Sequence, residues 1–450
     1  MSRDWKTRLK VLAAFSFVFA LSTGLSRAQA GAPARPEAAP EGAVPASLAQ
    51  EVITLRAEDG GTSSGVLYML KGTAPQTAVI AMHPRSDSGR NTFLFSLAEA
   101  GFASFGTANR YVNNDTDGIH EKMLLDIAAG VRFLKSRGFK KIVLLGQSGG
   151  GSLMAFYQSQ ATTTPPGRVK STPAGDPPDL NQFELIPADG LLTIIPHLGE
   201  GKILETRIDP SVINEGDPFS IDPSLDMYNP ANGFCLPPET TTYSKEFVAR
   251  YRAAQRARME RLDRWARSLI AEQNQYRQLT QQPGFKSLPL QQQQAIERRA
   301  DTERMMTLSR TFADLRFMDL SIDPSDRVVG ENSGTTPWRA TYALAPNPGF
   351  ISPRAFLSSR SSISSNAVTL KNIPKVTVPT LIVQGTAQRQ IYPSETRSIF
   401  EASGAKDKKL VWVEGGDVSF RPSGPKAGKG DQRQQATNAV VSWMQERFPH

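Results

Sequence analysis

The stretch that decides the fold is residues 141–157, which read KIVLLGQSGGGSLMAFY. Residues 142–145 are an apolar run typical of a buried strand, and the chain from Gly151 onward has the character of a helix. Between them stands Gly-Gln-Ser-Gly-Gly, with Ser148 at its centre. Glycine lets two backbone segments approach without a Cβ between them. The stretch therefore predicts a tight strand-to-helix turn that pushes the Ser148 hydroxyl out above a sheet.

The chain on either side alternates strand-like and helix-like segments. Strand-like runs cover residues 51–55, 64–70, 78–82, 103–106, 142–145, 190–195, 379–384 and 409–413, and helix-like runs cover 91–100, 119–136, 393–402 and 436–447. The first two strand-like runs are separated by a glycine turn typical of a hairpin. The later alternation predicts an α/β fold with a mostly parallel sheet and helices on both faces.

This alternation stops at residues 198–335. Two helix candidates fall inside that segment, at residues 244–279 and 289–318. We expect them to pack antiparallel as a helical cap over the C-terminal edge of the sheet. Such an insertion is either a lid that shapes a pocket or a solvated hairpin that only covers a surface. Its many arginines indicate an exposed face, with a binding stripe for acidic molecules as the alternative.

Taken together, these features resemble the bacterial α/β-hydrolase-fold serine hydrolases of esterase type. The segments that carry the resemblance are residues 83–89, 109–111 with 114–116, 146–150, 188–190 and 379–385. A Gly-x-Ser-x-Gly turn between strand and helix is the nucleophile elbow of that superfamily. The resemblance implies a core of residues 48–197 and 336–450, a cap of residues 198–335, and Ser148 as the nucleophile.

An oxyanion hole is the next feature that this resemblance implies. One donor is the backbone N–H of Gly149, the residue after the nucleophile, and the other comes from the loop after the third strand. That loop begins with His83 and Pro84. We expect His83 to be a structural residue of this loop and not the catalytic base.

The sequence departs from the family at the other two catalytic positions. The acid is expected in a Gly-x-x-Asp turn, where this chain has Gln388, and the histidine is expected after the last strand, where Val418 fits best. A glutamine cannot carry the charge that stabilises an imidazolium, and a valine cannot take or give a proton. The loss of both indicates that the usual proton relay is absent.

Replacement groups are available elsewhere. His197 and Glu200 follow the strand at 190–195, at the sheet edge where catalytic groups collect, and are the candidate base and acid. A structural or pocket-lining histidine is the alternative for His197. Asp417 is a further weak base, since the reference pKa of aspartate is about 3.9. His120 opens a helix, where we expect only local hydrogen bonding.

Metal and cofactor sites are not expected. Asp115, Asp117 and His120 are close in sequence but lack a ligand pattern, and a solvated turn before a helix explains them. Cys235 is the only cysteine, which excludes an intramolecular disulfide and a cysteine zinc site.

The N-terminus has the features of a secretory signal over residues 1–30. Four basic residues precede an apolar stretch at 11–25, and Ala28-Gln-Ala30 offers a cleavage site. An uncleaved anchor is the alternative. Residues 31–47 form an Ala/Pro-rich leader that we expect to be disordered. The sequence thus predicts an exported, periplasmic or secreted protein without stable membrane insertion after cleavage.

Charge limits the partners. The formal net charge is +9, of which residues 1–30 carry four, leaving a modest +5. This gives no case for nucleic-acid binding. Two functions remain: a serine hydrolase of carboxylic-ester or related acyl bonds with an incomplete or relocated triad, and a non-catalytic binding descendant. The substrate would be a small molecule, and the oligomeric state stays open.

Overall fold

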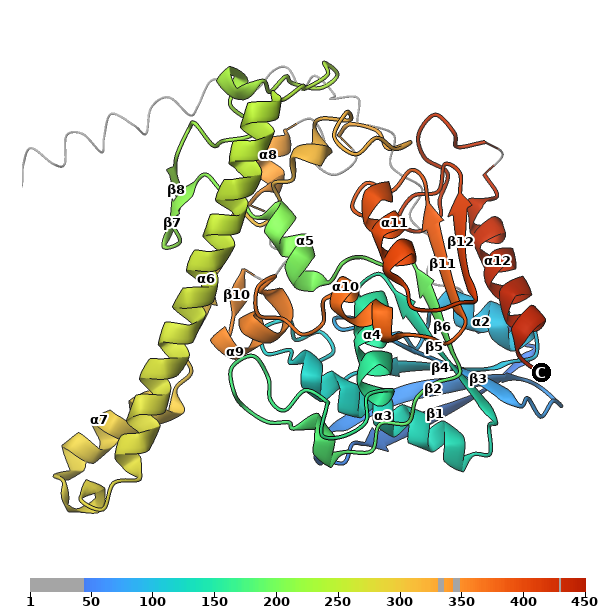
Figure 1. The fold of residues 1–450 in the computed structure, drawn as a ribbon, viewed down its shortest axis with the longest axis horizontal. Helices are drawn as coiled ribbons and strands as arrows, with labels where there is room; N and C mark the ends of the chain where they lie inside the picture. The colour runs from blue at the N-terminus through green and yellow to red at the C-terminus, as the bar shows by residue number, and fades with distance from the viewer. Residues whose placement is uncertain (1–43, 331–335, 343–348, 429) are drawn as a thin grey trace, which may run out of the picture. The chain divides into compact units, whose positions relative to one another are not determined.

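Among the described residues, eight strands form one sheet in the order β1-β2-β4-β3-β5-β6-β11-β12. The strands are β1 (Leu48–Arg56), β2 (Thr62–Leu70), β3 (Thr77–Met82), β4 (Ala103–Ala108), β5 (Lys141–Gln147), β6 (Gly190–Ile194), β11 (Thr380–Gly385) and β12 (Lys408–Val413). β2 runs antiparallel to both of its neighbours, and every other pair is parallel. This strand order is that of the α/β-hydrolase fold, which confirms the predicted fold (Figure 1).

The computed structural model describes residues 44–330, 336–342, 349–428 and 430–450. The signal peptide and most of the leader lie outside the described residues, so the exported location stays a prediction. No described helix is both long enough and apolar enough to cross a bilayer.

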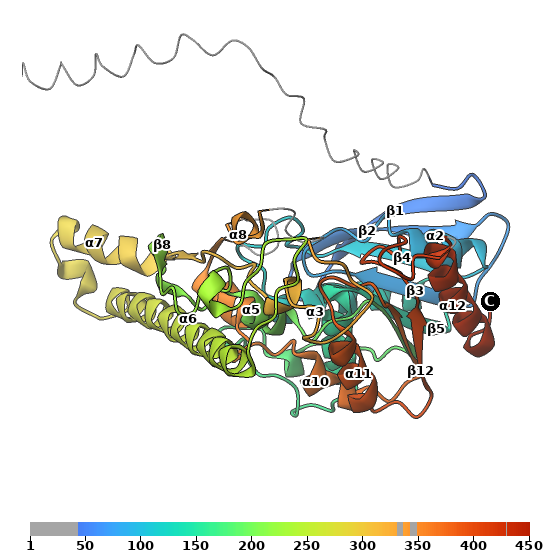
Figure 2. The same ribbon diagram turned by 90° about the horizontal axis from the view of Figure 1, so that it is seen from above.

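Helices cover both faces of the sheet (Figures 1 and 2). On one face lie α3 (His120–Ser136), α4 (Gly149–Ala161) and α11 (Pro393–Ala402), and on the other lie α2 (Thr92–Glu99) and α12 (Gln432–Arg447). Each face has its own buried apolar cluster, one containing Ile127, Leu153 and Ile399 and the other Phe93 and Trp443. Burial on both faces explains why the central strands are continuous apolar runs and do not alternate.

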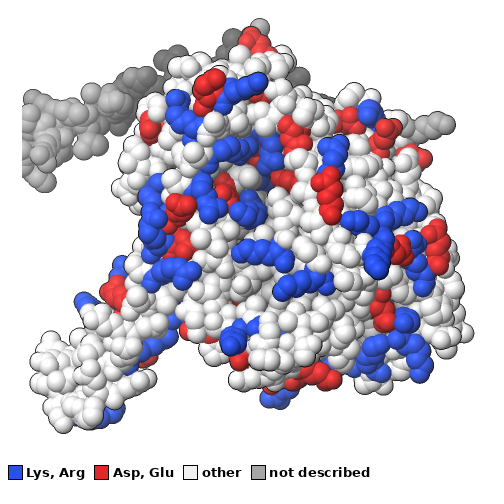
Figure 3. All heavy atoms as spheres, viewed as in Figure 1, with Lys and Arg blue, Asp and Glu red and all other residues white. Residues whose placement is uncertain are grey.

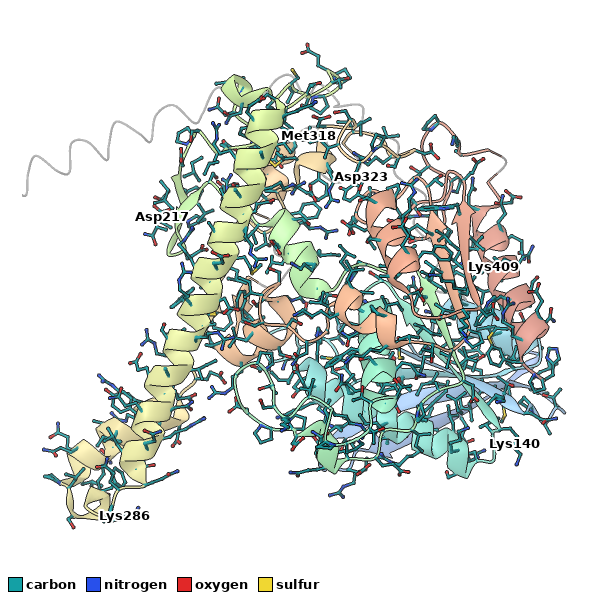
Figure 4. The ribbon with its side chains drawn as sticks, in the orientation of Figure 1. Lys140, Asp217, Lys286, Met318, Asp323 and Lys409 are labelled. Atoms are coloured by element: carbon teal, nitrogen blue, oxygen red, sulfur yellow. The ribbon has the colours of Figure 1, made fainter. Side chains whose placement is uncertain are left out.

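The insertion begins with α5 (Glu200–Arg207), the hairpin of β7 (Val212–Asn214) and β8 (Asp217–Ile221), and the long helix α6 (Lys245–Thr280). α6 packs against α7 (Leu290–Asp301), and together they form an arm that points away from the sheet (Figures 1 and 2). Lys286 marks the tip of this arm (Figure 4). The segment contains two helices packed on each other, but the far end of the arm does not cover the sheet, and its role as a cap stays a prediction.

The predicted second helix, 289–318, is too long, because α7 ends at Asp301. Beyond it the backbone bonds to residues at the end of α5, and a short 3-10 helix forms at Leu315–Phe317. The Ala313 N–H donates to the Arg207 carbonyl at 2.7 Å, and the Arg310 carbonyl accepts from the Asp209 N–H at 2.9 Å. Arg310 also has a φ of 52°, which no α-helix accommodates. Tertiary pairing has overridden local helical preference here.

Chain beyond residue 335 packs with the insertion. β10 (Phe350–Ile351) pairs with β9 (Met306–Thr307), and Phe356 shares a buried cluster with Met259 and Leu262 of α6. A second contact joins the insertion to the core, where Ser394 of α11 donates to Asp323 at 2.5 Å (Asp323 is labelled in Figure 4). The described residues 44–450 thus form one compact unit, and the boundary at 335 stays a prediction.

Acidic and basic side chains are interspersed on the face shown in Figure 3. Many of them pair, as Arg256 does with Glu260 at 3.1 Å and Arg267 with Asp263 at 2.9 Å on α6. Exposed arginines of α6 such as these therefore lie on a mixed-charge, partly paired helix face. Arg258 departs from the expectation, because it is fully buried and binds Glu215 and the Asp209 and Ser309 carbonyls.

Candidate active site

Ser148 lies between β5 and α4 in a strained conformation. Its φ is 50° and its ψ is −119°, a region that residues with a side chain rarely adopt. Its N–H donates to the Ile194 carbonyl at 2.8 Å. Serine at the start of a helix usually caps it with the hydroxyl, but Ser148 makes no such bond. The hydroxyl is therefore not used to cap the helix.

The turn is as tight as its glycines suggested. A Cβ on Gly146 would lie 2.4 Å from the Gly150 carbonyl oxygen, and a Cβ on Gly150 would lie 2.6 Å from that of Met82. Neither distance is possible for real atoms. The glycines of the motif are therefore required for the start of α4 to pack on the ends of β3 and β5.

A second strained residue ends the neighbouring strand. Gln147 is in register with Ile194, so β5 and β6 end at the same level. The next residue on β6, Ile195, is buried with a φ of 46°, an outlier for a β-branched side chain. Strain of this kind costs about 1–3 kcal/mol and persists where the surroundings enforce it. It turns the chain sharply and brings the segment from His197 to Glu200 beside the serine turn.

Gly149 is the point at which the predicted residues meet. A Cβ on Gly149 would lie 2.4 Å from Glu200 Oε1, 3.0 Å from Pro84 Cγ and 3.3 Å from His83 Nε2. Two loops, one after β3 and one after β6, therefore touch the residue that follows Ser148. The structure brings the two candidate oxyanion residues and the candidate acid together at the elbow.

Glu200 is the charged group of this site. The residue is 6% exposed, and one of its oxygens binds the Arg360 guanidinium while Oε1 lies 3.6 Å from His197 Nε2. Burial by itself raises the pKa of the Glu200 carboxyl, but the charges of Arg360 and the contact with His197 outweigh burial and hold the pKa well below its usual range. Glu200 is therefore a carboxylate at neutral pH.

His197 has both ring nitrogens engaged. Its Nδ1 accepts from the Gly199 N–H at 3.0 Å, so the ring proton is assigned to Nε2, which faces Glu200. This arrangement leaves no lone pair for the Ser148 hydroxyl. The role of His197 as base stays a prediction, and its present contacts position Glu200 instead.

His83 has the same tautomer as His197. Its Nδ1 accepts from the N–H groups of Arg85 at 3.1 Å and Ser86 at 3.2 Å. The proton is thus on Nε2, the nitrogen nearest Gly149. Burial lowers the pKa of His83 to about 4, so the ring is neutral at pH 7. It offers one N–H at the elbow and has no free lone pair with which to act as a base.

Asn109, which lies outside the loop that begins at His83, fixes the backbone of that loop. Asn109 Nδ2 donates to the carbonyls of His83 and Pro84 at 2.8 and 3.1 Å. Proline has no N–H, so Pro84 can line the elbow with its ring but cannot donate to an oxyanion. The candidate donors are therefore the Gly149 N–H and His83 Nε2–H.

Arg360 is the residue that the sequence did not reveal. It is the last residue of a π-helix, Phe356–Arg360, an element frequent at functional sites. It is 2% exposed, and its Nε has no partner among the described residues. Its other contact is Asp115 at 3.7 Å, which in turn binds Arg85 Nε at 2.7 Å. Asp115 thus belongs to a charge network and not to a solvated turn.

His120 is also part of this surrounding. It begins α3, is 2% exposed, and its Nδ1 has no partner among the described residues. Burial lowers its pKa to about 4, and Glu200, Arg360 and the other two buried histidines are close enough to influence it. Within the described residues, no group of His, Cys, Asp or Glu side chains could hold a metal ion.

Gln388 and Val418, the predicted positions of the missing acid and histidine, lie on loops that contact each other. Gln388 is fully buried, and its Nε2 donates to the Asp417 carbonyl, next to Val418, at 3.4 Å. The Asp417 carboxylate is occupied within its own loop by the N–H groups of Ser419 and Arg421, at 2.7 and 2.8 Å. Val418 packs against an apolar cluster. The two loops therefore contact each other, and the replacement of an acid and a histidine by Gln388 and Val418 stays a prediction.

Known proteins resemble this chain only distantly. No protein-family model matches it, and no curated protein does. Among solved structures, it is similar to an α/β hydrolase from Penicillium sp. sh18 (11% identity, TM-score 0.46, 89% of this chain and 99% of that one) and to the esterase domain of a Rhodothermus marinus protein (10%, 0.41, 88% and 98%). A monoacylglycerol lipase from Paleococcus ferrophilus aligns at 14% identity with a TM-score of 0.38, covering 88% and 98%. The fold assignment accordingly depends on the strand order and the serine turn, and not on these matches.

Proposed function

We propose that this protein is a serine hydrolase of small carboxylic esters or related acyl compounds, with Ser148 as its nucleophile. The observation that carries the proposal is the strained Ser148, whose hydroxyl caps no helix and whose neighbour Gly149 lies against the buried Glu200 carboxylate. A turn kept only for architecture would not need a serine there. Glu200 takes the place of the missing relay as proton acceptor, positioned by His197 and Arg360.

The chemistry follows from these contacts. Ser148 Oγ attacks the acyl carbon while its proton passes to the Glu200 carboxylate. The negative charge on the carbonyl oxygen is stabilised by the Gly149 N–H and His83 Nε2–H. Collapse of the intermediate breaks the bond to the leaving alkoxide, which takes the proton from Glu200, and water then hydrolyses the acyl-enzyme by the same route. Because Arg360 holds the Glu200 pKa low, the carboxylate is a weak base and turnover should be slow.

A second function is a non-catalytic binding protein. It is supported by Gln388 and Val418, which stand where the resemblance expects an acid and a histidine and lie on loops that contact each other. The same pocket would then bind an ester or acid without cleaving it.

Labelling with a fluorophosphonate probe separates the two. The hydrolase proposal expects covalent labelling of the unmodified chain, none with Ser148→Ala, and labelling slowed at least about tenfold by Glu200→Gln. Glu205→Gln, a change one helical turn further along α5, is the matched control and should label normally. An unmodified chain that stays unlabelled while binding p-nitrophenyl acetate without hydrolysis would establish the binding function instead.

A further inference from the structure

A cavity of about 220 Å³ lies between α6 and the C-terminal end of α7, in the arm whose tip is Lys286 (Figure 4). A single water occupies about 30 Å³ of liquid volume, so the space has room for a small organic molecule. Its lining includes Leu269, Glu272 and Gln273 from α6. None of these residues belongs to the candidate active site.

Gln273, one of the lining residues, has a buried donor without a partner among the described residues. The residue is 6% exposed, and its Oε1 accepts from Arg354 Nη1 at 2.7 Å. That bond fixes the amide orientation, because an arginine can only donate. The Nε2 of Gln273 is buried and has no partner among the described residues. A buried donor without a partner costs about 1–3 kcal/mol, which an acceptor atom on a ligand would recover.

Some of the charged side chains around the cavity have partners and others do not. Arg304 is paired with Glu272, and the Arg299 guanidinium lies 5.0 Å from the centre of the Tyr276 ring. Arg298 also lines the cavity, and among the described residues none forms an ion pair with it. The lining therefore combines the Arg298 guanidinium, which has no ion-pair partner among the described residues, with the unpartnered Nε2 of Gln273.

We infer that this cavity binds a small organic carboxylate. One carboxylate oxygen accepts from Gln273 Nε2 and the other from the Arg298 guanidinium, while a short aliphatic chain lies against the buried side chain of Leu269. The nearby Glu272 carboxylate disfavours a dianion such as phosphate, because like charges at close range repel. The inference does not depend on Ser148 acting as a nucleophile.

The test is a ligand-detected NMR titration of the full chain with sodium butyrate at fixed ionic strength. Butyramide serves as the uncharged analogue and inorganic phosphate as the alternative anion. We expect saturable butyrate binding and at least about tenfold weaker binding of both other probes, since hydrogen bonds to a charged group are stronger than neutral ones.

Two variants address the proposed contacts. Gln273→Glu keeps the acceptor for Arg354 but replaces the donor with a carboxylate oxygen, and Arg298→Gln removes the cation. Each should weaken butyrate binding at least about tenfold, whereas Arg264→Gln, at an exposed α6 arginine outside the cavity, and Ser148→Ala should not. A thermal unfolding midpoint for Gln273→Glu close to that of the unmodified chain excludes misfolding. Absent butyrate saturation, unchanged binding in Gln273→Glu, or tighter binding of phosphate would each overturn the inference.

Discussion

Glu200 and Arg360 form an ion pair that is almost completely buried beside the serine turn. They are 160 positions apart in the sequence, one at the start of α5 and the other at the end of a π-helix. Taking two charges out of water is expensive, and such a pair persists only with good geometry and further hydrogen bonds. The pair therefore joins the start of α5 to the π-helix that contains Arg360, beside the candidate active site.

Removing one member of this ion pair should lower the free energy of unfolding more than removing both. Glu200→Gln leaves the Arg360 guanidinium buried without its main counter-charge, which we expect to lower the free energy of unfolding by about 3 kcal/mol or more. In the double variant Glu200→Gln/Arg360→Met, most of this loss should be recovered. Urea unfolding of the single and double variants measures the coupling. Additive losses would show that the two side chains do not depend on each other.

Gly149 should not tolerate even the smallest side chain. The Cβ of Gly149→Ala would fall 2.4 Å from Glu200 Oε1, so the carboxylate must move or the turn must open. We expect a loss of about 1–3 kcal/mol in unfolding free energy, together with reduced fluorophosphonate labelling. Gly284→Ala is the matched control, because nothing lies within 4 Å of a Cβ there. Equal stability of the two variants would mean that Glu200 does not lie against the elbow.

Stability should rise with pH between about 4 and 6.5 because of the buried histidines. Burial lowers the folded-state pKa of His120 from 6.5 to about 4. The unfolded chain therefore binds more protons in this window, and acidification favours it by at most about 1.4 kcal/mol per pH unit for this one group. His83 acts in the same direction. His120→Asn should flatten the pH dependence of urea unfolding, and an unchanged slope would contradict the buried neutral ring.

The ionisation of Glu200 affects the free energy of unfolding in a separate, more acidic pH range. Its folded-state pKa lies well below the usual 4.5. The stability gained from the ionised Glu200 is therefore fully present above pH 4.5. As the pH falls through the folded-state pKa, that contribution is lost. Comparing Glu200→Gln with the unmodified chain below pH 4.5 should show the difference between them shrinking, whereas His120→Asn changes the slope mainly above pH 4.

Local patterns explain what could be predicted from the sequence. The serine turn and the strands depend on short-range features, namely glycine spacing and apolar runs, and these survive in the fold. The Glu200–Arg360 pair could not be predicted, because Arg360 lies in a serine-rich run with no motif. The helix predicted over 289–318 ends early, at Asp301, for a similar reason. The backbone beyond it pairs with distant residues such as Arg207. In both cases the local structure depends on residues that are distant in the sequence.

Introducing the acid and the histidine that the family usually has tests whether Ser148 can hydrolyse an ester once a proton relay is present. Gln388 and Asp417 already touch through the Gln388 amide and the Asp417 carbonyl, so Gln388→Asp with Val418→His would place an acid and an imidazole on loops that meet. We expect this double variant to hydrolyse p-nitrophenyl acetate at least about tenfold faster than the unmodified chain, because a general base contributes about 100-fold or more. Val418→His alone should gain less, since an imidazolium needs a nearby carboxylate to orient and stabilise it. Adding Ser148→Ala to the double variant must abolish the gain. If the gain persists without Ser148, the new histidine catalyses by itself, and the strained serine turn is not the site of attack.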